Sequence, residues 1–173
     1  MSYFKNIFTT GAISKTPRRV LKRITDEANP ERSALIIELG AGKGEITKNI
    51  IAKAGTRPLE YFAFEIHKEF SGQLKTEFPT IHVLEEDALH FDQFVKAKAD
   101  LIICSLPLSF FPKKDRITLL EKIRLNTRPG GKAIILFHAP WLISLLKSAL
   151  PGSKLIRIFN LPPYYITIYS PVN

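Results

Sequence analysis

The sequence has a single cysteine, Cys104, and therefore no disulfide within the chain. A lone thiol fits the reducing cytoplasm, where disulfides are rare. No apolar run approaches the ~18 to 20 residues of a membrane-spanning helix, and the N-terminus alternates polar and apolar residues where an export signal would be continuously apolar. We expect a cytoplasmic protein that can meet a membrane only peripherally, at its inner face.

Histidine is scarce too, and its spacing excludes the usual metal-binding motifs. The four histidines show no metal-ligand spacing with one another or with Cys104. They are His67, His82, His90 and His138. We therefore predict no metal site.

Acidic residues are outnumbered by basic ones, which gives a net charge of +9. A basic surface attracts the phosphates of nucleic acids and of anionic lipids. The basic residues that precede the first acid, Asp26, are Lys5, Lys15, Arg18, Arg19, Lys22 and Arg23. We expect a phospholipid membrane surface or RNA as partner, and charge alone does not distinguish them.

Short apolar runs alternate with segments of helical periodicity, and no repeat divides the chain, so we predict one domain over residues 1–173. The predicted strands are Leu35–Leu39, Tyr61–Glu65, Ile81–Leu84, Leu101–Cys104, Ala133–Phe137, Leu155–Phe159 and Tyr165–Tyr169. The predicted helices between them are Glu45–Lys53, His67–Phe78, Lys113–Leu125 and Trp141–Leu150. This order predicts a doubly wound, Rossmann-like α/β fold: a mostly parallel seven-stranded sheet with an antiparallel C-terminal strand and helices on both faces.

Glycines follow the first predicted strand, in the segment Glu38–Gly44, with Gly-x-Gly-x-Gly spacing. The dinucleotide loop that cradles a pyrophosphate has Gly-x-Gly-x-x-Gly spacing instead. A shorter loop fits a ligand without phosphate, such as the adenosyl group and methionine tail of S-adenosylmethionine. Glu38 is then placed to meet the cationic ammonium of that tail.

Acids follow the next two strands as well. Glu65 ends the second strand, where a carboxylate can bind both hydroxyls of a ribose, and Asp87 follows the third. Ligands of doubly wound sheets bind outside the carboxyl ends of the strands. If the glycines only formed a turn and the acids were only solvated, the recurrence of acids at three successive strand ends would be unexplained. We therefore favour a cofactor site.

These residues closely resemble those of class I methyltransferases that use S-adenosylmethionine. The resemblance, over Leu35 to Phe137, implies a methionine-binding loop at Glu38–Gly44, ribose recognition by Glu65, and adenine contacts from Asp87 and Ala88. The candidate cofactor-binding residues are Glu38, Gly40, Ala41, Gly42, Gly44, Glu65, Ile66, Asp87, Ala88 and Cys104. We expect Cys104 to be buried and not a nucleophile, because nothing near it in the sequence would activate a thiolate.

The segment after the fourth strand, Cys104–Pro112, is the expected acceptor site. Adenine methylases have Asn or Asp, then Pro-Pro or Leu-Pro, then an aromatic residue here, to bind and stack on the base. This chain keeps Leu106 and Pro107 but has Ser105 in place of the amide and Leu108 in place of the ring. Both base contacts are missing, although Phe110 or Phe111 could stack.

The same segment resembles that of bacterial phospholipid N-methyltransferases, which have a Ser-Gly-Leu-Pro-Leu type of sequence here. Asn160–Pro163 resembles their Asn-Leu-Pro-Pro ending, and the basic Phe4–Ile24 segment resembles their membrane-binding start. Ribosomal RNA dimethylases share the core. Ser105 replaces the expected glycine and His138 an expected tyrosine, so the acceptor stays open.

The N-terminal segment, residues 1–30, has helical periodicity with basic residues beside the apolar ones. Its apolar positions are Tyr3, Phe4, Ile7, Phe8, Val20, Leu21 and Ile24. A basic amphipathic helix can lie in the headgroup plane of a membrane. The alternative is a helix packed on the sheet with a solvated basic face.

We predict a methyltransferase for a phospholipid headgroup amine of the phosphatidylethanolamine type. The alternatives are an RNA adenine or small-molecule methyltransferase, and a non-catalytic adaptor that binds the cofactor. Only four residues, Ser170–Asn173, follow the last predicted strand, so we expect no added helical domain to grip RNA. The candidate catalytic residues are Ser105, Leu106, Pro107, Tyr164 and His138. The sequence does not indicate an oligomeric state.

Overall fold

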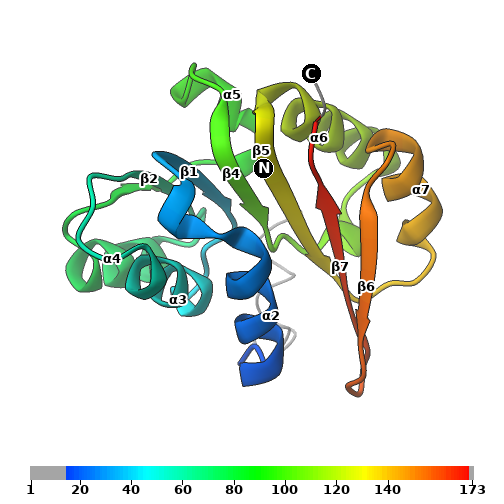
Figure 1. Cartoon of the computed structure of the whole chain (residues 1–173), viewed down its shortest axis with the longest axis horizontal. Helices are drawn as coiled ribbons and strands as arrows, with labels where there is room; N and C mark the ends of the chain where they lie inside the picture. The colour runs from blue at the N-terminus through cyan, green and yellow to red at the C-terminus, as the bar shows by residue number, and fades with distance from the viewer. Residues whose placement is uncertain (1–14, 172–173) are drawn as a thin grey trace.

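The structure is a computed structural model that describes residues 15–171. Seven strands form one sheet in the order β3-β2-β1-β4-β5-β7-β6 (Figure 1). The strands are β1 (Leu35–Leu39), β2 (Glu60–Phe64), β3 (His82–Leu84), β4 (Ala99–Cys104), β5 (Thr127–Phe137), β6 (Lys154–Ile158) and β7 (Tyr164–Tyr169). β7 pairs antiparallel with both β5 and β6, while the other pairs are parallel. The predicted fold class is confirmed.

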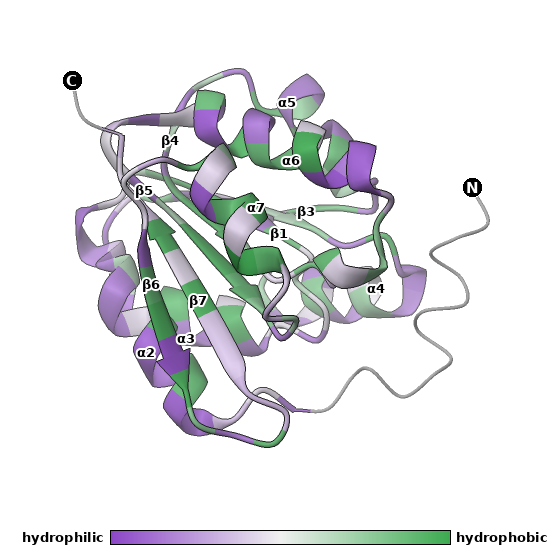
Figure 2. Cartoon of the chain, turned by 90° about the vertical axis from the view of Figure 1, so that its right-hand side faces the viewer, coloured by the Kyte–Doolittle hydropathy of each residue, from purple (hydrophilic) through white to green (hydrophobic). Residues whose placement is uncertain are grey.

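Helices cover both faces of the sheet, because the central strands are apolar on both sides. All of β1 is buried; Leu35, Ile37 and Leu39 belong to one core cluster and Ile36 to the other. One face carries α2 (Arg18–Ala28), α3 (Glu45–Ala54) and α4 (Lys68–Glu77), and the other carries α5 (Phe91–Phe94), α6 (Lys113–Asn126) and α7 (Leu142–Ala149). Figure 2 shows the green strands between these two layers.

Most predicted elements have their observed ends within one or two residues, and β5 is the exception. We predicted that this strand begins at Ala133, but β5 already begins at Thr127, opposite Ala99. The register then shifts, and Lys132 pairs with Leu101. A Cβ at Gly131 would lie 2.8 Å from the Asp100 carbonyl oxygen, so only glycine fits this irregular stretch.

The packing of helix α2 distinguishes between the two interpretations of the N-terminal segment, a helix in the plane of a membrane and a helix packed on the sheet. Its apolar side chains Val20, Ile24 and Ala28 are buried against α3 and the sheet, while Arg18 and Arg19 are exposed. Of the two alternatives for this segment, the helix packed on the sheet is therefore the one that α2 shows. Residues 1–14, including the predicted apolar face at Tyr3–Phe8, lie outside the described residues. Within residues 15–171, no helix is both long and apolar enough to span a bilayer.

Candidate active site

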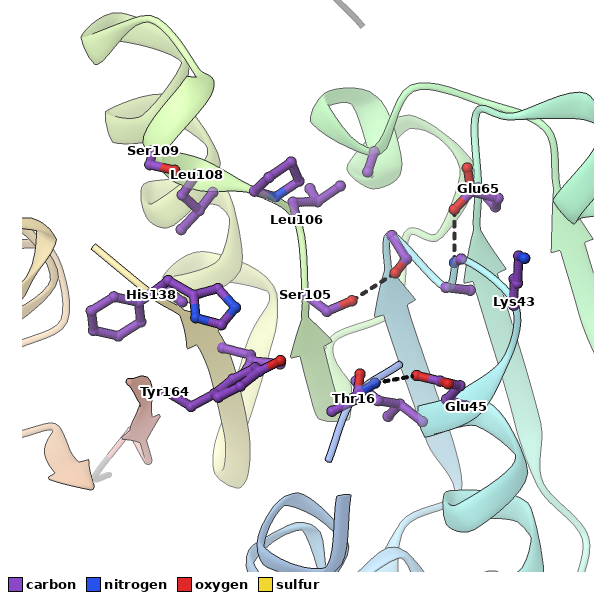
Figure 3. A pocket seen from close by; sticks show the side chains of 18 of the residues that line it. Thr16, Lys43, Glu45, Glu65, Ser105, Leu106, Leu108, Ser109, His138 and Tyr164 are labelled. Atoms are coloured by element: carbon purple, nitrogen blue, oxygen red, sulfur yellow. Dashed lines mark hydrogen bonds between the residues drawn. The ribbon is translucent and has the colours of Figure 1, made fainter. Parts of the chain in front are cut away.

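A cavity of about 910 Å³ opens at the carboxyl ends of the parallel strands (Figure 3). One part, which we call the cofactor half, is lined by residues 40–43, 64–66 and 86–88. The other part, the acceptor half, is lined by residues 105–110, 136–138, 160–162 and Tyr164. Nearly all predicted site residues thus lie around one space.

The glycine loop takes backbone conformations that favour glycine. Gly40, Gly42 and Gly44 have φ of 82°, 56° and 79°. A Cβ on Gly40 would lie 2.8 Å from the Leu106 side chain, so the loop lies close against the segment that follows β4. Gly44 packs on Leu74 and Phe78 and lies outside the cavity lining, so its predicted cofactor role stays a prediction.

Glu65 holds the glycine loop from the end of the neighbouring strand. Its carboxylate accepts hydrogen bonds from the backbone N–H groups of Gly42 (2.7 Å) and His67 (2.8 Å). Burial raises the pKa of Glu65, and these two hydrogen bonds partly oppose that shift. A carboxylate has about four lone-pair sites, so this one can still accept from a ribose.

Glu38 lies outside the cavity lining, and its predicted contact with the cofactor ammonium stays a prediction. It is fully buried and accepts hydrogen bonds from Thr47 Oγ1 (2.6 Å) and Tyr61 Oη (2.5 Å). Its Oε1 has no hydrogen-bond partner within the described part of the chain. Burial raises the pKa of Glu38 to about 7.

Cys104 also lies outside the cavity lining, and its predicted cofactor contact stays a prediction. It is fully buried at the end of β4, and burial raises the pKa of its thiol to about 12. Such a thiol stays protonated at neutral pH. The expectation of a buried cysteine is confirmed.

The remaining cofactor candidates form one wall of the cofactor half. Asp87 Oδ1 accepts a hydrogen bond from the Leu89 backbone N–H at 2.9 Å and caps a short 3₁₀ helix, Ala88–His90. Ile66 is partly exposed, and both Ile66 and Ala88 line the cavity. Apolar contacts flanked by a carboxylate suit a flat, hydrogen-bonding ring such as adenine.

Ser105 joins the two halves of the cavity. Its Oγ donates to the Gly40 carbonyl oxygen at 2.6 Å, and its backbone N–H donates to the Leu39 carbonyl oxygen at 3.0 Å. The hydroxyl proton is therefore committed to the glycine loop. Leu106 and Pro107 continue the lining beyond it.

His138 and Tyr164 meet across the acceptor half, one from the end of β5 and the other from the start of β7 (Figure 3). Their ring centroids are 4.0 Å apart. His138 Nδ1 lies 3.0 Å from the Pro163 carbonyl oxygen. A carbonyl only accepts, so this contact places the proton on Nδ1 and leaves Nε2 with a lone pair in the neutral ring.

Sequence reasoning missed part of the lining. Lys15–Pro17 reach the cavity, where the Thr16 backbone N–H donates to Glu45 Oε2 at 2.8 Å. Residues 160–162 line the far wall. Glu45, an acid in the first turn of the helix after the glycines, was the available signal for the first of these. No group of His, Cys, Asp and Glu within residues 15–171 is arranged to hold a metal ion.

Residues 36–131 match the model of a family described as a methyltransferase domain. The chain belongs to this family. The predicted resemblance to methyltransferases is confirmed at the level of the family.

Curated relatives are distant and diverse. The chain is 26% identical to an uncharacterized methyltransferase of Schizosaccharomyces pombe over 73% of this chain and 49% of that protein. It is 27% identical to the ornithine lipid N-methyltransferase of Singulisphaera acidiphila, over 65% of this chain and 62% of that protein. It is 24% identical to the ribosomal RNA small subunit methyltransferase A of Lactococcus lactis, over 82% of this chain and 41% of that protein. The chain thus spans about half of the length of the first of these relatives.

Solved structures share the fold. The N-methyltransferase NodS of Bradyrhizobium japonicum, in complex with S-adenosyl-L-homocysteine, superposes with a TM-score of 0.74 at 14% identity and covers 98% of both chains. An rRNA methylase from Streptococcus thermophilus has a TM-score of 0.67 at 14% identity and covers 94% of this chain and 100% of its own. At such identities the likeness shows the Rossmann-like architecture.

Proposed function

We propose that the chain uses S-adenosylmethionine to methylate the amine of a phospholipid headgroup at a membrane surface. The observation that carries this proposal is the composition of the acceptor half. Its lining has apolar side chains with His138 and Tyr164, and it has no carboxylate within the described residues. Such a wall suits the apolar part of a lipid beside an amine that must become neutral.

The residues of the cofactor half fit S-adenosylmethionine. The backbone of Gly40–Gly42 is open to close approach, and Glu65 has lone pairs left for ribose hydroxyls. Ile66 and Ala88 offer apolar contact to the adenine, with Asp87 beside them. The chemistry that this cofactor supplies is a methyl group on a cationic sulfonium.

The acceptor must then present a lone pair in line with that methyl group. An ammonium headgroup has none, so it first has to lose a proton. His138 Nε2 is the group that we assign as the proton acceptor, because the Pro163 carbonyl fixes the tautomer. Tyr164, with its ring 4.0 Å from that of His138, would orient the imidazole.

The lipid acceptor is further supported by the similarity to a lipid N-methyltransferase. RNA is the second candidate, because several relatives are ribosomal RNA methyltransferases and because Phe110 is an exposed ring in the cavity lining. Against RNA, position 105 lacks the amide that would bind adenine, and the Ser105 hydroxyl donates to Gly40 instead.

The test is transfer of labelled methyl from S-adenosylmethionine to phosphatidylethanolamine vesicles that contain anionic lipid, with ribosomal RNA in parallel. We expect label in the lipid fraction, reduced when residues 4–8 are deleted. Label in RNA alone would overturn the lipid proposal. Cofactor binding without transfer to either acceptor would favour the adaptor.

A further inference from the structure

Large apolar side chains are exposed around the opening of the acceptor half. Leu161 is 96% exposed, Phe159 76%, Trp141 56% and Phe110 55%. We call these four residues the mouth cluster. Leu161 and Phe110 line the cavity themselves, whereas Phe159 and Trp141 lie outside its lining.

The topology brings the mouth cluster to one edge of the sheet. Phe110 follows the carboxyl end of β4, and Trp141 follows that of β5. β6 runs parallel to β5, because both pair antiparallel with β7. The turn from β6 to β7, with Phe159 and Leu161, therefore lies at the same edge and extends beyond it (Figure 1).

An arginine side chain lies against each of two exposed aromatic rings. The Arg157 guanidinium lies 5.1 Å from the centroid of the Phe159 ring, and the Arg116 guanidinium lies 4.6 Å from that of Trp141. Further exposed cations start the elements at this edge, Lys113 and Lys114 in α6 and Arg18 and Arg19 in α2. The exposed Arg157 thus combines a phosphate-binding donor with the apolar ring of Phe159, whereas Nε and Nη1 of Arg116 are buried.

We propose that the mouth cluster is a membrane-docking surface for an anionic bilayer. Phe159, Leu161 and Trp141 enter the headgroup layer, where amphipathic aromatic residues concentrate, and the neighbouring arginines and lysines bind lipid phosphates. The acceptor half then opens directly onto the lipid. A protein partner on the same cluster would close the cavity, whereas a bilayer supplies an acceptor to it. This inference rests on the proposed function and identifies where its substrate enters.

The test compares binding of the full-length chain to vesicles of phosphatidylethanolamine and phosphatidylglycerol with binding to phosphatidylcholine vesicles. The variant is Phe159→Ser with Trp141→Ser. The matched control is Leu125→Ser, which removes another half-exposed apolar side chain from the opposite end of α6. We expect the double variant to bind anionic vesicles at least roughly tenfold more weakly, since it loses the burial of two aromatic rings. The control should bind like the wild type.

A second measurement separates docking from folding and chemistry. On a short-chain phosphatidylethanolamine dispersed as monomers, the double variant should keep its methyl transfer, because neither altered residue lines the cavity. Undiminished vesicle binding by the double variant, or an equal loss in Leu125→Ser, would overturn the docking surface. If the wild type binds vesicles through the cluster but methylates no lipid, the proposed function fails and the surface stands. If the wild type and the double variant methylate vesicle lipid equally, the docking surface fails and the proposed function stands.

Discussion

The two halves of the cavity are built in different ways. In the cofactor half, buried or strand-end groups bind the backbone directly: Glu65 accepts from Gly42, and Ser105 donates to Gly40. In the acceptor half, two loops and a hairpin converge, and side chains such as Leu161 extend into solvent. The geometry of the cofactor half is fixed by hydrogen bonds between neighbouring strands. The shape of the acceptor half depends on which loops lie next to one another.

This difference assigns separate tasks to the two halves. A site whose groups already have their bound geometry loses little conformational entropy when its ligand arrives. The hydrogen-bonded loop at Gly40–Gly42 suits one constant ligand, the cofactor. The exposed hairpin suits an acceptor that arrives from another phase. Substitutions should therefore separate cofactor affinity from turnover.

The largest effect is expected from Gly42→Val, in the cofactor half. Gly42 lines the cavity at φ 56°, so a branched side chain would both strain the loop and occupy cofactor space. Affinity for S-adenosylmethionine, measured by calorimetry, should fall on the order of a thousandfold, or about 4 kcal/mol. Glu65→Ala should weaken binding in the same direction.

Gly152→Val is the matched control for this substitution. Gly152 has φ 77°, and, as at Gly42, a Cβ there would meet nothing within 4 Å. It lies outside the cavity lining. The control should lose stability but keep cofactor affinity. Equal affinity in wild type and Gly42→Val would remove the glycine loop from the cofactor site.

The same contrast explains how much the sequence could predict. The strands and the glycine loop follow from apolar runs and from glycines at a strand end, both of which are local patterns. The meeting of His138 with Tyr164 depends on β7 lying between β5 and β6, and strand order is not a local property. The surroundings of Glu38 could not be predicted, because a carboxylate beside the glycines can face either the ligand or the core. Here one of its oxygens accepts hydrogen bonds from Thr47 and Tyr61 in the core.

The next effect concerns the acceptor half alone. His138→Asn keeps a donor for the Pro163 carbonyl but removes the proton acceptor. If His138 takes the proton of the headgroup amine, kcat should fall about a hundredfold while the cofactor Kd stays unchanged. Added imidazole should restore part of the rate. His90→Asn, an exposed histidine outside the cavity, serves as control. An unchanged kcat in His138→Asn would show that another group takes the proton.

The smallest effect is on stability and concerns Glu38, beneath the cofactor half. Its pKa is raised by burial from 4.5 to about 7, so between these values the folded chain keeps a proton that the unfolded chain has released. The stability linked to Glu38 is therefore fully present below about pH 4.5 and is lost as the pH rises through 7. Glu38→Gln stays neutral and can still accept from Thr47 and Tyr61.

Urea unfolding at pH 5 and pH 7.5 measures this difference. The free energy of unfolding of the wild type should fall by about 2 kcal/mol more than that of Glu38→Gln over this interval. The raised pKa of Glu65 acts in the same direction in both proteins and cancels in the comparison. Parallel pH dependence in the two proteins would mean that Glu38 is ionised throughout. Its unpartnered Oε1 would then need a cationic neighbour, and the predicted contact with the cofactor ammonium would regain support.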